Sequence, residues 1–476
     1  MEFRSNRGVQ EGALVRVFNH WFSPRKAVYF LAEETVLVVA LLAGASLGPV
    51  AAHAGGAAAP LAPGVLRAGV ASVIFAGALY LGDLYDLHSA VRDRTDGRRL
   101  LRALGVAAVA LALSDVALQA LVMPGWMLRG SLVLAAAGGA LGVIGARALM
   151  PAVVGAPTRV LFVGAGARAR DLSRAVEREA EGFWEVVGFS VPEDGALPVL
   201  VNPEAVLPGS VAEAARRARA QVIVVALEDR RGVSVDELLA LRTRGLRVVD
   251  DGGFAEAALQ RIPLALIRPS ALIFDEGFRV SRATRATKRI ADLVVSAVLL
   301  VALAPAMAAV ALAVWLADGR PLLYSQERVG RAGRAYRIWK FRTMRRDAER
   351  LGAAWATDRD PRILPAGRFL RRSRLDELPQ LLNVLRGQMS LVGPRPERAV
   401  FLSELKARWP LFALRELVQP GLTGWAQLRY GYGSTMEEQA RKLEYDLYYI
   451  KNTSLFLDLV CLLATAKVVL LGRGAR

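Results

Sequence analysis

The stretch RRSRLDELPQLLNVLRGQMSLVGPRPE, residues 371–397, places an acidic pair, Asp376-Glu377, directly after a group of arginines. Leucines then recur at i, i+3, i+4 and i+7, which predicts a helix with one apolar face; they are Leu378, Leu381, Leu382 and Leu385. Pro379 is tolerated in a first helical turn, and Gly387 is expected to end the helix. Carboxylates at a helix start among arginines indicate a site for a phosphate and a divalent cation. The alternative is purely structural, because a helix dipole favours acidic residues in the first turn.

The same stretch ends in Gly393-Pro394-Arg395-Pro396, which predicts a stiff turn because each proline fixes its own φ. We expect this turn to hold one arginine, Arg395, in a fixed direction. The arginines that precede the acidic pair either neutralise an anion or only contact lipid; they are Arg371, Arg372 and Arg374.

The composition indicates an integral membrane protein with a basic cytoplasmic part, because 54% of the 476 residues are hydrophobic and the formal net charge is +18. Nucleic acid is the other usual partner of so basic a chain. The apolar segments favour lipid head groups and phosphorylated substrates, and we expect no nucleic acid partner.

Disulfides, cysteine metal sites and histidine chemistry are excluded from the C-terminal half. The only cysteine, Cys461, lies in an apolar stretch, so no intrachain disulfide and no cysteine metal site can form. The histidines are His20, His53 and His88. Ser-His-Asp triads and histidine-bound zinc are therefore excluded there, and carboxylates and arginines remain.

The N-terminal part, 1–150, is predicted to be a four-helix transmembrane bundle, without a cleavable signal peptide. Its apolar segments are 27–48, 65–84, 102–123 and 130–150, each near the ~20 residues that a bilayer requires. Lysine and arginine crowd the N-terminal tail and the loop 85–101, so both ends of the bundle are expected in the cytoplasm. Charged residues inside the spans should face other helices; they are Glu33, Glu34 and Asp115.

Residues 157–265 predict a Rossmann-like module of alternating strands and helices. RVLFV, WEVVGFSV, QVIVVAL and LRVVDD read as strands. Gly164 and Gly166 follow the first strand in the pattern GAGxxA, which is similar to a dinucleotide or CoA-type nucleotide fingerprint. The alternative is a regulatory or dimerising module that binds no nucleotide.

A basic connector, 266–287, leads into an apolar run, 290–317, that is broken by Pro305. A straight crossing would place the remainder of the chain outside. The flanks are basic on both sides, and a proline interrupts helical hydrogen bonding, so we expect a re-entrant helix that kinks and returns to the same face. Lys288 and Arg289 are expected to contact phosphate head groups of lipid.

The remainder, 288–476, is predicted to be a mainly α, membrane-associated catalytic domain. A β-hairpin is expected around residues 330–333 that ends in Lys340-Phe341-Arg342; Lys340 and Arg342 either face the substrate or are basic strand ends. A helix is expected from about Thr435 to Ile450. The apolar tail 455–471 either spans the bilayer or lies in its interface, and the interface is favoured.

Three motifs in this domain resemble a known family, the bacterial sugar transferases, which are polyprenol-phosphate glycosyl-1-phosphate transferases. The motifs are KFRTM, SRLDELPQLLNVLRGQMSLVGPRPE and PGLTGWAQ, and the resemblance covers about 284–476. The N-terminal spans and the Rossmann-like module are similar to those of the large members. RIPL followed by IFDEGF resembles the subgroup associated with exopolysaccharide and exosortase-type systems.

The resemblance implies a reaction in which a UDP-sugar and undecaprenyl phosphate give polyprenyl-diphospho-sugar and UMP, with Mg²⁺, as the first step of exopolysaccharide or O-antigen synthesis. It implies a covalent aspartyl-phosphosugar, with Asp376 as nucleophile and metal ligand and Glu377 as its partner. Substrate-binding residues implied with them are Arg371, Pro394, Arg395 and Pro396. Pro305 matches the helix-breaking proline, although Ala304 stands where serine is common. The family acts in the bacterial inner membrane, with the catalytic domain on the cytoplasmic face.

Other functions remain to be weighed against this one. A nucleotide-sugar dehydratase or epimerase needs a Tyr-x-x-x-Lys pair, and residues 158–265 contain neither tyrosine nor lysine. A non-catalytic scaffold of polysaccharide assembly would tolerate replacement of the acidic pair. The sequence leaves open which sugar is transferred, and whether the chain forms a homodimer.

Overall fold

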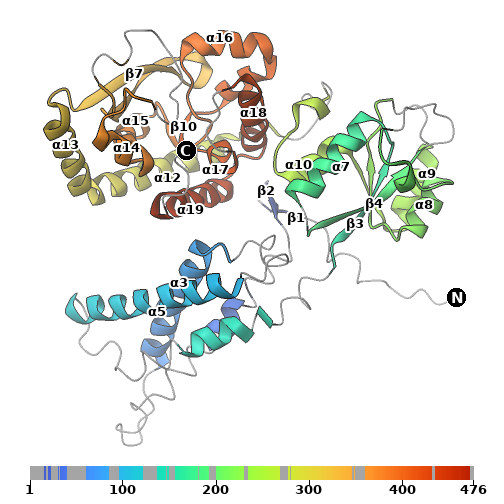
Figure 1. Ribbon diagram of the computed structural model, residues 1–476, viewed down its shortest axis with the longest axis horizontal. Helices are drawn as coiled ribbons and strands as arrows, with labels where there is room; N and C mark the ends of the chain where they lie inside the picture. Colours follow the sequence, from blue (N-terminus) through green and yellow to red (C-terminus); the bar gives the residue numbers. More distant parts are fainter. Residues whose placement is uncertain are drawn as a thin grey trace, which may run out of the picture. The chain divides into compact units, whose positions relative to one another are not determined.

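The computed structural model describes residues 15–17, 20–22, 31, 33–39, 61–84, 96–121, 137–145, 147–148, 156–180, 182–191, 200–229, 234–268, 277–278, 280–345, 348, 360–430 and 435–471. Internal contacts divide the chain into two compact units (Figure 1). The first comprises Met1–Val15 and Phe22–Val249, and the second comprises Arg16–Trp21 and Asp250–Arg476. Two short strands near the N-terminus, β1 (Val15–Val17) and β2 (His20–Phe22), pair with each other.

Helices α3 (Leu61–Leu81) and α5 (Asp96–Leu121) form much of the N-terminal part, at the positions of the second and third predicted spans. They share a buried apolar cluster that includes Phe75 and Leu111. Glu33 is fully buried and forms an ion pair with Arg147 at 3.3 Å. Glu34 accepts a hydrogen bond from Ser72 at 2.5 Å, so both glutamates face other helices as expected. The side chain of Asp115, like much of the first and fourth predicted spans, lies outside the described residues.

The Rossmann-like module contains a four-stranded sheet in the order β4-β3-β5-β6. Its strands are β3 (Thr158–Val163), β4 (Trp184–Ser190), β5 (Val222–Val225) and β6 (Arg247–Asp250), and β3 pairs in parallel with both β4 and β5. All four predicted strands are therefore confirmed. A 3₁₀ turn, η1 (Pro203–Ala205), follows β4. Helix α7 (Ala167–Glu179) lies on one face of the sheet, and α8 (Val211–Arg217) and α9 (Val235–Thr243) lie on the other (Figure 1).

The first elements after β6 are α10 (Asp251–Leu259), which precedes the predicted boundary at residue 265, and the 3₁₀ turn η2 (Leu264–Leu266), which spans it; both belong to the second unit. This segment is tied to α18 (Met436–Lys451) by buried charged groups. Arg261 binds Glu444 at 2.5 Å, and Glu256 binds Lys451 at 2.8 Å and Asn452 at 2.9 Å. The segment that follows β6 thus packs as part of the second unit.

The apolar run 290–317 forms parts of two helices, α12 (Arg282–Ala302) and α13 (Ala304–Asp318). The chain bends by 61° between them. Pro305 lies in the first turn of α13, where its missing N–H is tolerated, so the predicted break is confirmed. In the described part of the chain no single helix has the length and apolar character to cross a membrane, and this bent pair meets that test only as a pair.

The predicted β-hairpin is confirmed as β7 (Leu323–Val329) and β8 (Ala335–Phe341), which pair antiparallel around the 3₁₀ turn η3 (Arg331–Gly333). Strands β9 (Ser390–Val392) and β10 (Gly421–Thr423) form a short parallel pair. The remaining elements are α14 (Pro365–Arg372), η4 (Leu375–Gln380), α15 (Leu381–Leu385), α16 (Ala399–Arg408), η5 (Pro410–Leu417), α17 (Trp425–Arg429) and α19 (Leu455–Leu471).

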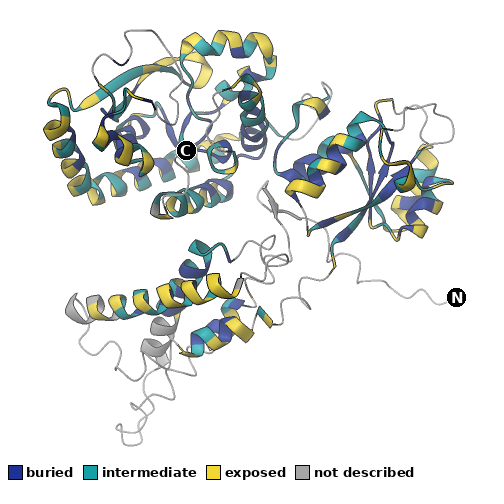
Figure 2. Ribbon diagram, in the orientation of Figure 1, coloured by how far each residue is buried: buried dark blue, intermediate teal, exposed yellow. Residues whose placement is uncertain are grey.

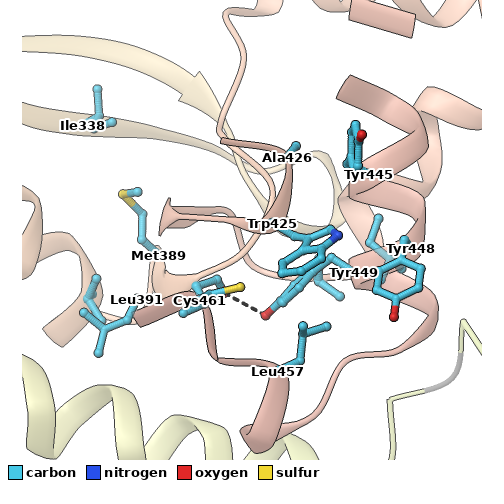
Figure 3. Close-up of a cluster of buried hydrophobic side chains, with 14 of the residues drawn as sticks. Ile338, Met389, Leu391, Trp425, Ala426, Tyr445, Tyr448, Tyr449, Leu457 and Cys461 are labelled. Atoms are coloured by element: carbon cyan, nitrogen blue, oxygen red, sulfur yellow. Dashed lines mark hydrogen bonds between the residues drawn. The ribbon is translucent and has the colours of Figure 1, made fainter. Parts of the chain in front are cut away.

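The core of the second unit lies where β9, α17, α18 and α19 meet (Figure 3). Helix α18 begins as predicted, because Thr435 and Glu438 form a capping box. It directs three aromatic side chains, Tyr445, Tyr448 and Tyr449, toward the core. Leu457 and Cys461 of α19 pack against them, and Figure 2 shows the burial along these helices.

Candidate active site

The acidic pair lies on η4, a 3₁₀ turn, rather than in the first turn of an α-helix. The sequence predicted an α-helix from this point, but α15 begins only at Leu381. Pro379 has no N–H with which to donate a helical hydrogen bond, and Arg374 adopts a left-handed conformation with φ 56° that turns the chain into η4. Gly387, with φ 78°, follows the end of α15 as predicted.

Glu377 is the point at which cations from three elements meet. Its Oε1 accepts hydrogen bonds from Lys340 Nζ of β8 at 2.7 Å and from Arg395 Nη2 at 3.0 Å. Arg374 Nη1 lies 3.8 Å from Oε2. Burial alone would raise the pKa of Glu377, but Lys340, Arg395 and Arg374 together hold the pKa well below its usual range. Glu377 is therefore a fixed anion that organises the cations around it.

Asp376 differs from its neighbour, because its carboxylate has no hydrogen bond or ion pair among the described residues. The side chain is only 7% exposed. Burial raises the pKa of Asp376 to about 6, against the lowering effects of Lys340, Arg371 and Arg395. Near neutral pH the group is thus mostly ionised, desolvated and not engaged by protein donors. These are the properties of a carboxylate that can attack or bind an electrophile.

The two basic residues at the end of the hairpin, Lys340 within β8 and Arg342 directly after it, have different roles. Lys340 lies beside Glu377, so the structure brings it to the acidic pair. Arg342 instead donates to Asp318 Oδ2 at 2.6 Å and to the carbonyl oxygens of Asp318 and Gly319, both at 2.9 Å. Arg342 therefore joins β8 to the C-terminal end of α13, and the structure does not bring it to the acidic pair.

The turn that carries Arg395 is held on both sides. The carbonyl oxygen of Pro394 accepts from Gly421 N at 2.9 Å, and that of Pro396 accepts from Arg328 Nη1 at 3.1 Å. Arg415 Nη2 donates to the carbonyl oxygen of Arg395 itself at 2.6 Å. These contacts fix the backbone from which the Arg395 guanidinium reaches Glu377.

Gly393 opens this turn and has no room for a side chain. A Cβ at this position would clash with the carbonyl oxygen of Gln419 and approach the Gly421 nitrogen to 2.9 Å. The turn is therefore fixed by its packing as well as by its two prolines.

Arg371 lies in the last turn of α14 and influences the acidic pair through its charge. It lowers the pKa of Asp376, after Lys340 and Glu377 in order of effect among charged groups. It also acts on Asp360, a buried carboxylate whose principal partner is Arg362. The charge of Arg371 therefore acts on both Asp376 and Asp360, and its role in binding an anion stays a prediction.

Lys288 and Arg289 turn toward the protein. Arg289 donates to the carbonyl oxygens of Val384 and Leu385, at 2.6 and 2.8 Å, at the end of α15. Lys288 Nζ donates to Asp458 Oδ2 at 2.6 Å and to the carbonyl oxygen of Val392 at 3.1 Å. Contact with lipid head groups stays a prediction for both, while the structure gives each of them acceptors within the protein.

The glycines of the Rossmann-like module are explained in part by packing. Gly164 has φ 111°, and a Cβ there would lie 2.8 Å from the carbonyl oxygen of Ala226. Gly166 is the N-cap of α7, forms no side-chain capping hydrogen bond, and leaves open space where a Cβ would lie. Nucleotide binding at this turn stays a prediction.

Sequence reasoning missed Asn383, which connects α15 to the hairpin. Its Oδ1 accepts from Trp339 N at 3.1 Å, and its Nδ2 donates to Arg337 O at 2.7 Å and to Gln388 at 2.8 Å. This fully buried amide fixes β8, and therefore Lys340, relative to η4 and α15. The available signal was one polar residue within a leucine-rich helix.

Comparisons with known proteins now identify the family. The model of the family described as "Bacterial sugar transferase" matches residues 283–472. A Caulobacter vibrioides UDP-glucose:undecaprenyl-phosphate glucose-1-phosphate transferase is 42% identical over 185 residues, which cover 38% of this chain and 69% of that protein. The chain belongs to the bacterial sugar transferase family.

Other members of the bacterial sugar transferase family match in the same way. An Aeromonas hydrophila UDP-N-acetylgalactosamine-undecaprenyl-phosphate N-acetylgalactosaminephosphotransferase is 41% identical over 189 residues, covering 40% of this chain and 45% of that protein. A Komagataeibacter xylinus undecaprenyl-phosphate glucose phosphotransferase is 33% identical over 344 residues, covering 67% of this chain and 60% of that protein. The chain therefore spans about half the length of these two relatives.

Proposed function

We propose that this protein transfers a sugar 1-phosphate from a UDP-sugar to undecaprenyl phosphate, with release of UMP, as the first step of exopolysaccharide or O-antigen synthesis. The names of its relatives support this class of donor and acceptor. The observation that carries the proposal is the contrast between the two adjacent carboxylates. Glu377 is held by three cations, whereas Asp376 is desolvated, largely ionised and without a protein partner among the described residues.

In the first step an oxygen of Asp376 attacks the phosphorus that carries the sugar. A bond forms between that oxygen and phosphorus, and the phosphoanhydride bond to UMP breaks, so that UMP leaves with the bonding electrons. In the second step an oxygen of undecaprenyl phosphate attacks the same phosphorus. The aspartyl oxygen leaves, which frees Asp376 and gives polyprenyl-diphospho-sugar.

The basic residues around the pair lower the barrier through their charge. The attack brings an anionic carboxylate to an anionic diphosphate, so fixed cations are needed where negative charge accumulates. Lys340 and Arg395 are oriented by Glu377 and approach from β8 and from the Pro394–Pro396 turn. Arg371 adds a third positive charge from α14.

A Mg²⁺ ion fits this donor set. In the described part of the chain no cluster of three or more metal-ligating side chains occurs, and the unengaged carboxylate of Asp376 is available. Mg²⁺ is commonly held by one or two carboxylates together with substrate phosphates and water. When bound, it would neutralise diphosphate charge, with Asp376 as its protein ligand.

We further propose that the α12–α13 pair enters the membrane and returns, so that the catalytic domain, 288–476, stays on the cytoplasmic face of the inner membrane. Large apolar side chains are exposed on this pair and on α19 (Figure 2). They include Val294, Val298, Val301, Leu312, Leu316, Leu459 and Leu463. Helices α12 and α19 lie along the same edge of the second unit, which supports one continuous membrane-facing surface (Figure 1).

The N-terminal half completes the proposed organisation. Residues 1–150 would form the four-helix membrane bundle, and exposed apolar side chains on α5, such as Val109 and Leu113, support lipid contact. Residues 157–265 would form a Rossmann-like module that either binds a nucleotide or contributes to a homodimer.

The test measures UMP release by protein in nanodiscs with undecaprenyl phosphate, Mg²⁺ and UDP-linked glucose, galactose, N-acetylglucosamine or N-acetylgalactosamine. We expect one donor to be preferred and Asp376→Asn to lower the rate by about a thousandfold or more. Without acceptor, the native protein should release one UMP per active site and gain the mass of one sugar phosphate.

Asp360→Asn is a matched control, because Asp360 is another buried aspartate of the same unit but is bound to Arg362. It should retain UMP release. Release that survives in Asp376→Asn would exclude Asp376 as nucleophile, and no release with any donor would favour a scaffold.

A further inference from the structure

We propose that Lys288, Tyr449 and Asp458, together with Asp292, are positioning residues that hold strand β9 and, through it, Arg395 beside Glu377. We name these four residues the β9 clamp. They come from three helices, α12, α18 and α19, and none of them contacts the acidic pair. The inference rests on the proposed function, because Arg395 matters only if the acidic pair performs chemistry.

The first half of the clamp surrounds the carbonyl oxygen of Val392, the last residue of β9. Lys288 Nζ donates to this oxygen at 3.1 Å, and Tyr449 OH lies 3.0 Å from it. Asp458 joins the two, because its Oδ2 accepts from Lys288 at 2.6 Å and its Oδ1 accepts from Tyr449 at 2.7 Å. Figure 3 shows the Tyr449 ring pointing from α18 toward Cys461 of α19, one helical turn beyond Asp458.

The second half of the clamp, Asp292, holds the backbone amide of Leu391, the residue before Val392. Asp292 Oδ1 accepts from Leu391 N at 3.0 Å. Asp292 follows Lys288 by one helical turn on α12, so the same face of this helix engages both a donor and an acceptor of β9. Asp292 is 3% exposed, Tyr449 1% and Asp458 7%, which excludes a solvent-facing role for these groups.

The backbone between the clamp and the arginine is too constrained to absorb a displacement. Gly393 N donates to Thr423 O at 2.9 Å, and Gly421 N donates to Pro394 O at 2.9 Å. A Cβ on Gly393 would clash with its neighbours, and Pro394 fixes the next φ angle. A shift of Val392 is therefore passed on to Arg395, whose Nη2 lies 3.0 Å from Glu377 Oε1.

The chemistry of the clamp favours a geometric role over simple stabilisation. A buried ion pair contributes little net stability compared with apolar residues of similar size, because both charges must be desolvated. It does impose direction, since hydrogen bonds to charged groups are short and oriented. Through the clamp, α12, the helix proposed to enter the membrane, thus helps to set the position of Arg395.

The first experiment compares Tyr449→Phe with Thr465→Val in the full-length protein. Thr465 of α19 hydrogen-bonds Thr423 of β10 at 2.7 Å, so this control loses a part-buried side-chain hydrogen bond beside the same short sheet, but on the strand that does not lead to Arg395. We expect Tyr449→Phe to lower kcat for UMP release about tenfold, with KM for the donor changed less than about threefold. Thr465→Val should lower kcat less than about twofold.

A double-mutant comparison shows whether the effect passes through Arg395. In an Arg395→Ala background, Tyr449→Phe should lower kcat for UMP release by less than about twofold, because the guanidinium that Tyr449 helps to position is already absent. A second variant, Lys288→Met with Asp458→Leu, removes the ion pair without leaving one charge buried, and it should behave like Tyr449→Phe. Equal losses with and without Arg395 would overturn the proposal.

Hydrogen exchange provides a measure that does not depend on catalysis. Amides of 390–398 should exchange about tenfold faster in Tyr449→Phe than in the native protein or Thr465→Val, while thermal unfolding confirms that the variants are folded. If exchange at 390–398 is unchanged in Tyr449→Phe, the proposed role of the β9 clamp is overturned, even where the native protein releases UMP as proposed. Faster exchange in a protein that releases no UMP would support the clamp and refute the proposed function.

Discussion

Replacement of Lys340 by glutamine should shift the pH dependence of the first chemical step. Among the charged groups that act on Asp376, Lys340 is the one that lowers its pKa most. One nearby opposite charge typically lowers a carboxyl pKa by about 1 to 3 units. Loss of Lys340 should therefore raise the pKa of Asp376 from about 6 to about 7 or higher.

The direction of the change in rate with pH follows from the reactive form of Asp376, which is the ionised carboxylate. A group with a pKa of about 6 is roughly three-quarters ionised at pH 6.5, whereas one with a pKa of about 7 is roughly one-quarter ionised. The rate of the first step in Lys340→Gln, relative to the native protein, should therefore be about threefold lower at pH 6.5 than at pH 8.5. At pH 8.5 Asp376 is almost fully ionised in both proteins. Any loss that persists at high pH reports the other roles of Lys340.

The assay is the single-turnover burst of UMP without acceptor, between pH 5 and 9. Undecaprenyl phosphate is omitted because a phosphate monoester itself ionises near pH 6. Arg342→Gln is the matched control, because Arg342 is a basic residue on the same segment that binds Asp318 instead of Glu377. Its midpoint should stay near that of the native protein. An unshifted midpoint in Lys340→Gln, or a burst independent of pH in the native protein, would refute the reasoning.

Three further changes test other features of the structure. Asn383→Leu removes hydrogen bonds to buried backbone groups and should lower the free energy of unfolding by about 2 to 4 kcal/mol, measured by denaturant titration. Gly393→Ala should abolish UMP release, because the added Cβ has no room; full activity would show that the turn is free to move. Cysteines placed at Ser281 and Arg320, in a chain whose own Cys461 is buried, should both be labelled by an impermeant maleimide only from the cytoplasmic face. Labelling from opposite faces would show that α12–α13 crosses the membrane.

Much of the fold was predictable because the deciding signals are local. Apolar runs and glycine turns located the four strands of the sheet and the hairpin, and Pro305 located the break between α12 and α13. The arginines before the acidic pair and the Pro394–Pro396 turn pointed to one site, and the structure brings Arg395 to Glu377 there. The structure also brings Lys340 to Glu377, although the sequence left it either facing the substrate or at a strand end.

The remainder depends on contacts between residues far apart in the chain. Leucine periodicity predicted an α-helix where Pro379 and Arg374 produce a 3₁₀ turn. Arg342 lies two residues after Lys340, yet it turns toward α13, and no local pattern records that choice. Lys288 and Asp458 are 170 residues apart, so their pairing was not visible in the sequence.

The ion pairs between the segment after β6 and helix α18 determine where the chain can be shortened. The family match begins at residue 283, but the contacts of Glu256 and Arg261 lie before it. A chain that starts at residue 283 would keep Glu444 and Lys451 but lose their partners, Arg261 and Glu256. One buried charge left without its partner destabilises a fold more than the removal of both charges does. A shortened chain that folds should therefore start before Asp250, or carry apolar replacements at Glu444 and Lys451.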